Sequence, residues 1–282
     1  MEYFSLTHEE INSILPVRNP DSHKGDFGKI LLLCGSRGYT GAAALAAMGA
    51  LRCGAGLVYL AVPECIYAIE AVKLTEPIVI PLSGSENTFS IDAASMVEKL
   101  LDGKDAVLIG PGLGCTEGSL CVLKTVLQKF CGPVVIDADG INLLQHHRDL
   151  VRGRIAATIL TPHMGEFQRI GGNAELVRSH AAAELAQDLG AIILLKGHET
   201  VITDGIDCYI NHTGNPGMSV GGCGDVLAGI ITALLGQGIA PLEAAACGAW
   251  LHGAAGDICA AEIGQYGMLP TDMLAVLPRL LK

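Results

Sequence analysis

Short runs of aliphatic and β-branched residues alternate along this chain with alanine-rich stretches of helical length. Several of the runs are apolar at nearly every position, as happens when helices cover both faces of a parallel sheet. We expect strands at residues 29–35, 57–63, 77–82, 105–110, 133–138, 157–161, 191–196 and 199–204, and helices at 41–53, 90–102, 117–130, 174–189, 225–236 and 242–260. This alternation predicts a doubly wound α/β fold with a largely parallel central sheet.

The chain has 282 residues, enough for one large α/β domain or two small ones. It contains no linker, internal repeat or low-complexity segment, so a single domain over residues 1–282 is expected. Residues 1–22 precede the first predicted strand, and we expect them to form a helical extension laid across that domain.

Charge and cysteine content exclude several classes of protein. The net charge is −11 and no Lys/Arg-rich run is present, which argues against a nucleic-acid partner. The N-terminus lacks the pattern of a signal peptide. No apolar run is close to the length of a membrane span, which is about 18 residues. None of the ten cysteines forms a C-x-x-C pair, so free thiols in a reducing cytoplasm are expected.

Unusual residues follow the predicted strands. "GSRGYTGA" follows the first strand, "GPGLG" the fourth, "DADGIN" the fifth, "TPHMGE" the sixth and "KGHET" the seventh, while "GNPGMSVGGCGD" follows a further extended segment. In open α/β sheets, ligands bind beyond the carboxyl ends of the strands. Six such segments at one rim predict a binding site there.

The glycine-rich stretch before Asp225 is the strongest of these signals. Five of the eleven residues from 214 to 224 are glycine, and an apolar helix is expected to begin at Asp225. The backbone N–H groups of Gly222, Cys223 and Gly224 would form an anion hole for a transferring phosphoryl group. Asp225 would then act as a general base, and the structural alternative is that it only caps the helix.

Two further segments, "TPHMGE" and "DADGIN", offer polar side chains, each with a structural alternative. His163 could contact substrate, and Glu166 could contact Mg²⁺ through water or simply belong to a helix N-terminus. Asp137, Asp139 and Asn142 could hold a metal or a sugar hydroxyl, or shape a turn. The segments match neither a Walker A loop nor the dinucleotide fingerprint, and no set of zinc ligands is evident.

Three other residues complete the candidates. Lys196 ends a predicted strand, where a lysine can contact phosphate, or where the glycine after it simply forms a tight turn. His252 and Trp250 lie in an apolar helix, and His252 is expected to be a core histidine with satisfied hydrogen bonds.

Together these motifs resemble the NAD(P)H-hydrate dehydratases, a ribokinase-like family. The resemblance runs from about His23 to the C-terminus, in family order, through "HKGDFGKILLLCGSRGYTGAAALAA", "GPGLG", "DADGIN", "TPHMGE", "KGHETVI", "GNPGMSVGGCGDVLAGI" and "LHGAAGD". Related sugar and vitamin kinases commonly have Asn where this chain has His163, which favours the dehydratases.

The resemblance implies that hydrated NADH or NADPH is dehydrated at the expense of ADP or ATP, with Mg²⁺. ADP is expected as the phosphoryl donor, with AMP as a product. By the same resemblance, the hydrated cofactor would contact Ala42 or Ala43, Gly112, His163 and Asp225. The nucleotide would contact Lys196, Gly197, His198, Glu199, Thr200 and Gly224.

The resemblance also leaves alternatives and departures. Cys223 stands where the family usually has Thr, Ser or Ala, so a hydroxyl contact would be lost. The epimerase half found in some relatives is not matched, and a separate epimerase and a homotetramer are expected. The alternatives are an ATP-dependent kinase of a small alcohol or vitamin precursor, and a catalytically silent nucleotide-binding regulator.

Overall fold

A single mixed sheet forms the centre of the molecule. The structure is a computed structural model that describes residues 2–281. Within those residues ten strands lie in the order β1-β10-β9-β8-β7-β6-β5-β2-β3-β4. Their bounds are β1 Glu2–Phe4, β2 Lys29–Leu33, β3 Leu57–Pro63, β4 Ile78–Leu82, β5 Ala106–Ile109, β6 Val134–Ile136, β7 Thr158–Leu160, β8 Ile192–Leu195, β9 Thr200–Thr203 and β10 Asp207–Asn211. Each predicted strand contains one of them.

All neighbouring strands are parallel except at β9, which runs antiparallel to both β8 and β10. The reversal between β9 and β10 is a tight turn in which the Asp204 carboxylate accepts hydrogen bonds from the N–H groups of Ile206 and Asp207. Because β10 points the same way as β8, the glycine-rich stretch after β10 starts at the same rim as the loops after β2, β5, β6, β7 and β8. The predicted convergence of these segments is confirmed.

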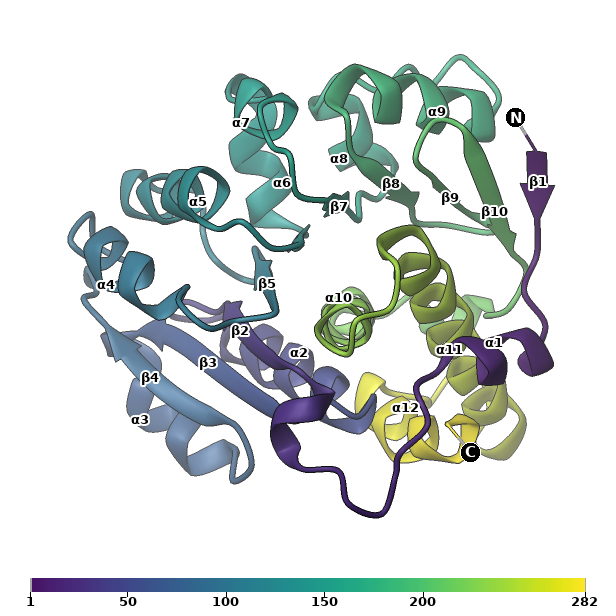
Figure 1. The fold of residues 1–282 in the computed structure, drawn as a ribbon, viewed down its shortest axis with the longest axis horizontal. Helices are drawn as coiled ribbons and strands as arrows, with labels where there is room; N and C mark the ends of the chain where they lie inside the picture. The colour runs from purple at the N-terminus through teal and green to yellow at the C-terminus, as the bar shows by residue number, and fades with distance from the viewer. Residues whose placement is uncertain (1, 282) are drawn as a thin grey trace.

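Helices cover both faces of the sheet, as Figure 1 shows. Ile30 and Leu32 of β2 point into one core with α2, α10 and α11, while Leu31 and Leu33 point into the other with α5 and α9. The helices are α1 His8–Ile14, α2 Thr40–Arg52, α3 Glu64–Lys73, α4 Ala93–Leu100, α5 Glu117–Lys129, α6 Asp139–Leu143, α7 Asp149–Arg152, α8 Met164–Arg169, α9 Arg178–Leu189, α10 Cys223–Gly236, α11 Pro241–Glu262 and α12 Pro270–Val276. The α/β fold with helices on both faces is confirmed.

Glycines let α2 and α10 approach at backbone distance. A β-carbon on Gly49 of α2 would lie 2.6 Å from the carbonyl oxygen of Val226, and one on Gly229 of α10 would overlap the carbonyl of Ala46. The two helices are adjacent near the middle of the molecule (Figure 1). Both begin at the rim where the loops converge, so their contact fixes the relative position of their N-termini.

The N-terminal segment differs in part from the prediction. A helix is present, α1, but it follows a strand, β1, that pairs in parallel with β10 at the sheet edge. The His8 ring of α1 stacks on Trp250 of α11, with ring centroids 5.4 Å apart. The expectation of a purely helical extension over 1–22 is therefore wrong, and residue 1 lies outside the described range.

Two expectations from composition can be compared with the structure. Among residues 2–281, no helix is both long enough and apolar enough to cross a bilayer. All ten cysteines are free; six are buried, Cys65 and Cys121 are half-buried, and Cys115 and Cys131 are exposed. The predicted free thiols are confirmed.

Candidate active site

The glycine-rich stretch leads into the first turn of α10. Gly222 is the N-cap residue, with φ of +103°, a conformation that favours glycine. The helix therefore begins at Cys223, two residues before the predicted start, and Asp225 is its third residue. The helix-cap alternative for Asp225 is wrong, because the cap is Gly222 and makes no side-chain bond.

This first turn presents backbone N–H groups to the rim. The Cys223 N–H makes only a long contact, 3.5 Å, to the Val220 carbonyl. The N–H groups of a first helical turn have no partner within the helix, and they attract anions. Gly222, Cys223 and Gly224 are thus arranged as an anion hole requires.

Asp225 stands in this turn as a partly buried carboxylate. Burial raises its pKa to about 7, with a further contribution from the negative charge of Asp137 and a partial opposing effect from Lys196. A carboxylate with a pKa near neutrality can both accept and release a proton at physiological pH.

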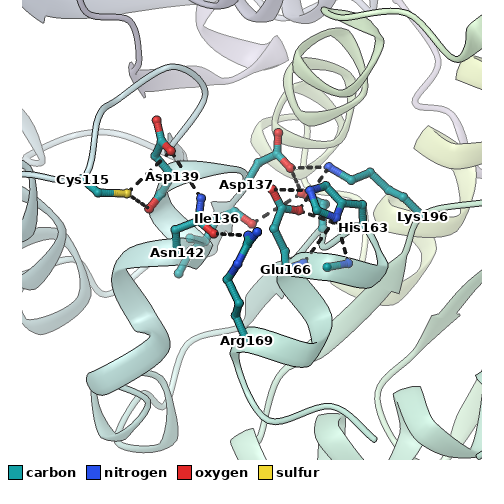
Figure 2. Close-up of polar contacts among 11 residues, drawn as sticks. Cys115, Ile136, Asp137, Asp139, Asn142, His163, Glu166, Arg169 and Lys196 are labelled. Atoms are coloured by element: carbon teal, nitrogen blue, oxygen red, sulfur yellow. Dashed lines mark hydrogen bonds and ion pairs between the residues drawn. The ribbon is translucent and has the colours of Figure 1, made fainter. Parts of the chain in front are cut away.

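Lys196, at the end of β8, is bound by a group of buried acids. Its Nζ lies 2.8 Å from Asp137 Oδ1 and 3.9 Å from Glu166 Oε2 (Figure 2). Burial opposes the charge on Lys196, but Asp137 and Glu166 outweigh it, so the pKa of Lys196 is raised. Lys196 is therefore a stable cation at the rim.

His163 and Glu166 organise the start of α8. The imidazole Nδ1 accepts hydrogen bonds from the N–H groups of Gly165 and Glu166, and Glu166 Oε2 accepts one from the His163 N–H at 2.9 Å. Accepting at Nδ1 leaves the ring proton on Nε2, which lies 3.3 Å from Glu166 Oε1. Both residues therefore cap α8, and the exposed face of His163 also lines the cavity described below.

The two acids of "DADGIN" point to different partners (Figure 2). Asp137 faces Lys196, whereas Asp139 accepts a hydrogen bond from the Gly114 N–H at 2.8 Å and one from Asn142 at 3.3 Å. Asn142 in turn accepts from Arg169 at 2.8 Å. The pair does not converge on a shared ligand, and residues 2–281 hold no group of three or more His, Cys, Asp and Glu side chains arranged for a metal.

The "KGHET" segment forms the turn between β8 and β9. Glu199 has φ of +54°, rare for a residue with a side chain, and Thr200 Oγ1 donates to the Gly197 carbonyl at 2.9 Å. Arg178 of α9 donates to the carbonyl oxygens of Leu195 and Lys196 at 2.9 and 3.2 Å. These contacts hold a turn whose own side chains are exposed.

A cavity of about 920 Å³ lies between this turn and the start of α10. Its lining contains the predicted residues His163, Lys196, Gly197, His198, Glu199, Thr200, Cys223 and Gly224. Ala42, Ala43, Gly112, Asp137, Asn142, Glu166, Gly222 and Asp225 do not line it. The structure therefore groups the predicted nucleotide set around one cavity, and of the predicted substrate set only His163 lines it.

The substrate set lies beside α2. Gly112 packs against Ala42, since a β-carbon on Gly112 would lie 3.0 Å from that of Ala42. Ala43 is fully buried and packs under Gly35, while Ala42 is partly exposed. Of the two alanines, Ala42 is the one whose side chain can touch a ligand.

Part of the cavity wall was not predicted from the sequence. Residues 214–216 and 218–220 of the lining belong to the glycine-rich segment that was predicted at this rim. Residues 211–213, Leu227, Ala249, His252 and Gly253 complete the lining and were not predicted. The position of 211–213 at the end of an extended segment was a signal that could have indicated them. His252 is buried as expected, but among residues 2–281 its Nε2 has no hydrogen-bond partner, so the expectation of satisfied bonding is wrong. Burial lowers the pKa of His252 to about 4.

Comparison with known proteins places the chain. Residues 30–279 match the family model described as NAD(P)H-hydrate dehydratase. The bifunctional NAD(P)H-hydrate repair enzyme of Moorella thermoacetica is 43% identical over 284 residues, covering 98% of this chain and 53% of that protein. The chain thus spans about half the length of the curated relatives it matches.

Comparison with solved structures indicates the same family. The ADP/ATP-dependent NAD(P)H-hydrate dehydratase of Bacillus subtilis, co-crystallised with ATP/Mg²⁺, superposes with a TM-score of 0.84 at 32% identity, covering 97% of this chain and 96% of that one. A ribokinase-like superfamily protein of Enterococcus faecalis superposes with a TM-score of 0.87 at 28% identity, covering 99% and 95%. The fold is ribokinase-like, and the chain belongs to the NAD(P)H-hydrate dehydratase family.

Proposed function

We propose that this chain dehydrates damaged, hydrated NADH or NADPH back to the reduced cofactor, using ADP and giving AMP and phosphate. One observation carries the proposal: in a member of this family, a carboxylate with a pKa raised to about 7 stands in the first turn of α10, at the edge of a cavity that also holds Lys196. The enzyme is accordingly a carbon–oxygen lyase.

The reaction begins with phosphoryl transfer. Asp225 takes the proton from the ring hydroxyl of the hydrated nicotinamide, and the hydroxyl oxygen bonds to the terminal phosphorus of the nucleotide as the bond to the leaving phosphate oxygen breaks. The N–H groups at the start of α10 and the Lys196 ammonium stabilise the negative charge on the phosphoryl oxygens.

Elimination completes the reaction. The lone pair of the ring nitrogen forms a double bond into the ring, and the C–O bond to phosphate breaks. Loss of a ring proton restores the reduced nicotinamide. Phosphate is a far better leaving group than hydroxide, which is why a kinase-like site can perform a net dehydration.

The division of residues between the two substrates follows their grouping in the structure. The nucleotide would occupy the cavity and contact Lys196, Gly197, His198, Glu199, Thr200 and Gly224. The hydrated ring would lie against Ala42, Gly112 and His163, with its hydroxyl toward Asp225.

Mg²⁺ fits this site as a partner of the nucleotide phosphates. Asp137, Glu166 and Asp225 surround the single cation Lys196, so the group carries net negative charge that favours a divalent cation. Glu166 would reach the ion through water, because its oxygens already contact His163. When bound, Mg²⁺ supplies neutralisation of the phosphate charge.

The family also suggests partners. We propose a homotetramer, supported by exposed apolar side chains on α3, and an epimerase that interconverts the two forms of the hydrate in the same pathway. Residence in the reducing cytoplasm, expected from the free cysteines, stays a prediction.

A spectroscopic assay tests the function. Purified protein is incubated with hydrated NADH plus ADP, and separately plus ATP, each with Mg²⁺, while NADH absorbance and free phosphate are measured. Regain of NADH absorbance with one phosphate released per NADH is expected. If neither reaction restores NADH absorbance while an unrelated alcohol is phosphorylated, the result would instead support the kinase alternative.

A further inference from the structure

The phosphoryl transfer and the elimination proposed above assign no proton or bond to Asp137, although its carboxylate is held by strong contacts. The side chain is 2% exposed. Its Oδ1 accepts a hydrogen bond from Thr161 Oγ1 at 2.7 Å and one from Lys196 Nζ at 2.8 Å. A buried carboxylate needs such partners, and here they include the Lys196 ammonium, which lines the candidate active site.

Asp137 and Lys196 together lie against the first turn of α10. A β-carbon on Gly224 would lie 3.5 Å from Lys196 Nζ and 3.9 Å from Asp137 Oδ2. The ion pair therefore lies just beyond the place that a β-carbon on Gly224 would occupy, next to the backbone that forms the anion hole. Asp137 holds the ammonium at the point where the phosphoryl oxygens are expected.

The backbone around Asp137 is strained in a way that fixes its direction. Ala138 has φ of +47° and ψ of −117°, a combination that residues with a β-carbon rarely adopt. Gly110, with φ of +131°, lies so close to the Asp137 carbonyl that no β-carbon fits there. Strain of this kind persists where the surroundings fix a functional side chain.

The charges of this ion pair affect the pKa of Asp225. The charged groups that affect it are Asp137 and Asp139, from the segment after β6, and Lys196, from the end of β8. The titratable groups Cys34, Cys223 and His252 also lie nearby, on the end of β2, on α10 and on α11, and burial keeps all three neutral at pH 7. After burial, the charge of Asp137 is the largest influence raising the pKa of Asp225, and Lys196 acts in the opposite sense.

We propose that Asp137 is a positioning residue of the dehydratase: it anchors the Lys196 ammonium beside the Gly224 turn, where the phosphoryl oxygens of the nucleotide are expected. The geometry of the ion pair stands whatever the substrate is, while the catalytic consequence rests on the proposed function. Asp137 would touch neither substrate.

Carbon-13 NMR of the aspartate carboxyl groups tests the coupling without any assay of activity. The Asp225 signal is assigned by its loss in Asp225→Asn and titrated in the wild type, Asp137→Asn and Lys196→Gln. Removing the acid is expected to lower the titration midpoint of Asp225 by about one pH unit, and removing the lysine to raise it. Opposite shifts would not follow from a merely structural role.

Asp139→Asn and Thr161→Val serve as matched controls. The first removes a carboxylate that faces Gly114 instead of Lys196, and the second removes a hydrogen bond to Asp137 without changing charge. Both are expected to move the midpoint by less than Asp137→Asn. Equal shifts in Asp139→Asn and Asp137→Asn, or none in Asp137→Asn, would overturn the proposal. If Asp137→Asn does not fold, Lys196→Gln decides: a midpoint that is unchanged or lowered counts against the coupling.

Kinetics then separate this proposal from the function itself. In wild-type protein that dehydrates hydrated NADH, the acid limb of the kcat/KM profile is expected near pH 7 and should move to lower pH in Asp137→Asn, with a raised KM for the nucleotide. An active wild type whose limb is unmoved in the variant rejects the role of Asp137 alone. An inactive wild type rejects the proposed function, while the NMR shifts still test the ion pair.

Discussion

Asp225 is at once close to an anion-binding helix terminus and costly to ionise. Burial and Asp137 hold its pKa near 7, although the positive end of α10 favours a negative charge. Such a balance is what a general base requires.

Replacing this carboxylate should therefore stop turnover and spare binding. We expect Asp225→Asn to lose about a hundredfold or more in kcat, because no other group at the start of α10 can take the proton. Nucleotide affinity, measured by calorimetry, should stay close to that of the wild type. Asp92→Asn, an exposed aspartate next to α4, is the control. Near-normal turnover in Asp225→Asn would return Asp225 to a structural role.

The same residue should make the protein less stable as pH rises. Its pKa is about 7 in the folded state against 3.8 for an ordinary aspartate, so between these limits the folded state binds more protons and stability falls with pH. Asp225→Asn removes this loss. The difference in unfolding free energy, variant minus wild type, should grow from pH 4 to 7 and stay constant above. Urea titrations at several pH values measure it, and a difference that shrinks with pH would contradict the assignment.

At the level of single residues, much of the site could be predicted, because polar residues and glycines are unusual directly after buried strands. Lys196 and the turn after it line the cavity as expected. The position of Asp225 in α10 was wrong by two residues, since a glycine with positive φ can end a loop anywhere in a run of glycines. The ion pair of Lys196 with Asp137 joins residues from separate strands, and local sequence carries no signal for it.

At the scale of elements, the contact between α2 and α10 should govern stability. Gly229→Ala is expected to destabilise the protein by about 1–3 kcal/mol, because the new methyl group overlaps the Ala46 carbonyl and the helices must separate. Denaturant unfolding gives the change.

Gly41→Ala is the matched control on α2. A β-carbon there meets no atom within 4 Å, so stability should be unchanged or raised by no more than about 1 kcal/mol. If Gly229→Ala behaved like Gly41→Ala, the close contact of the two helices would not be required.

Strands and long helices could be predicted because their apolar periodicity is set by burial on the sheet. Helix α3 was missed because its outer face is apolar too, so "ECIYAIEAVK" shows no amphipathic pattern. Strand β10 was expected only as an extended segment without bounds, because "DCYIN" is short and half-buried near the sheet edge. Both elements depend on neighbours distant in sequence.

For the whole molecule, the apolar face of α3 bears on assembly. Tyr67, Ile69 and Val72 are 37%, 48% and 88% exposed on this helix, and Ile78 of the edge strand β4 is 42% exposed. Exposed apolar patches of this kind mark interaction surfaces. We expect Val72→Glu to reduce the mass of the proposed oligomer in light scattering, because a buried, unpaired charge destabilises an interface.

Val17→Glu gives the comparison, since Val17 is 81% exposed and lies away from α3. The mass of this variant should equal that of the wild type. Loss of assembly in both variants, or in neither, would show that the face of α3 does not hold the subunits together.

The close contact between α2 and α10 also bears on how such an enzyme can evolve. In the proposed function, one of these helices begins beside the hydrated ring and the other begins at the phosphoryl group. The two helices are joined through glycines and main-chain carbonyls. Their alignment therefore depends little on which side chains surround it. Substitutions in the converging loops can change which ligand binds while the two helix N-termini keep their relative position. New specificities can therefore evolve in this family without loss of catalytic geometry.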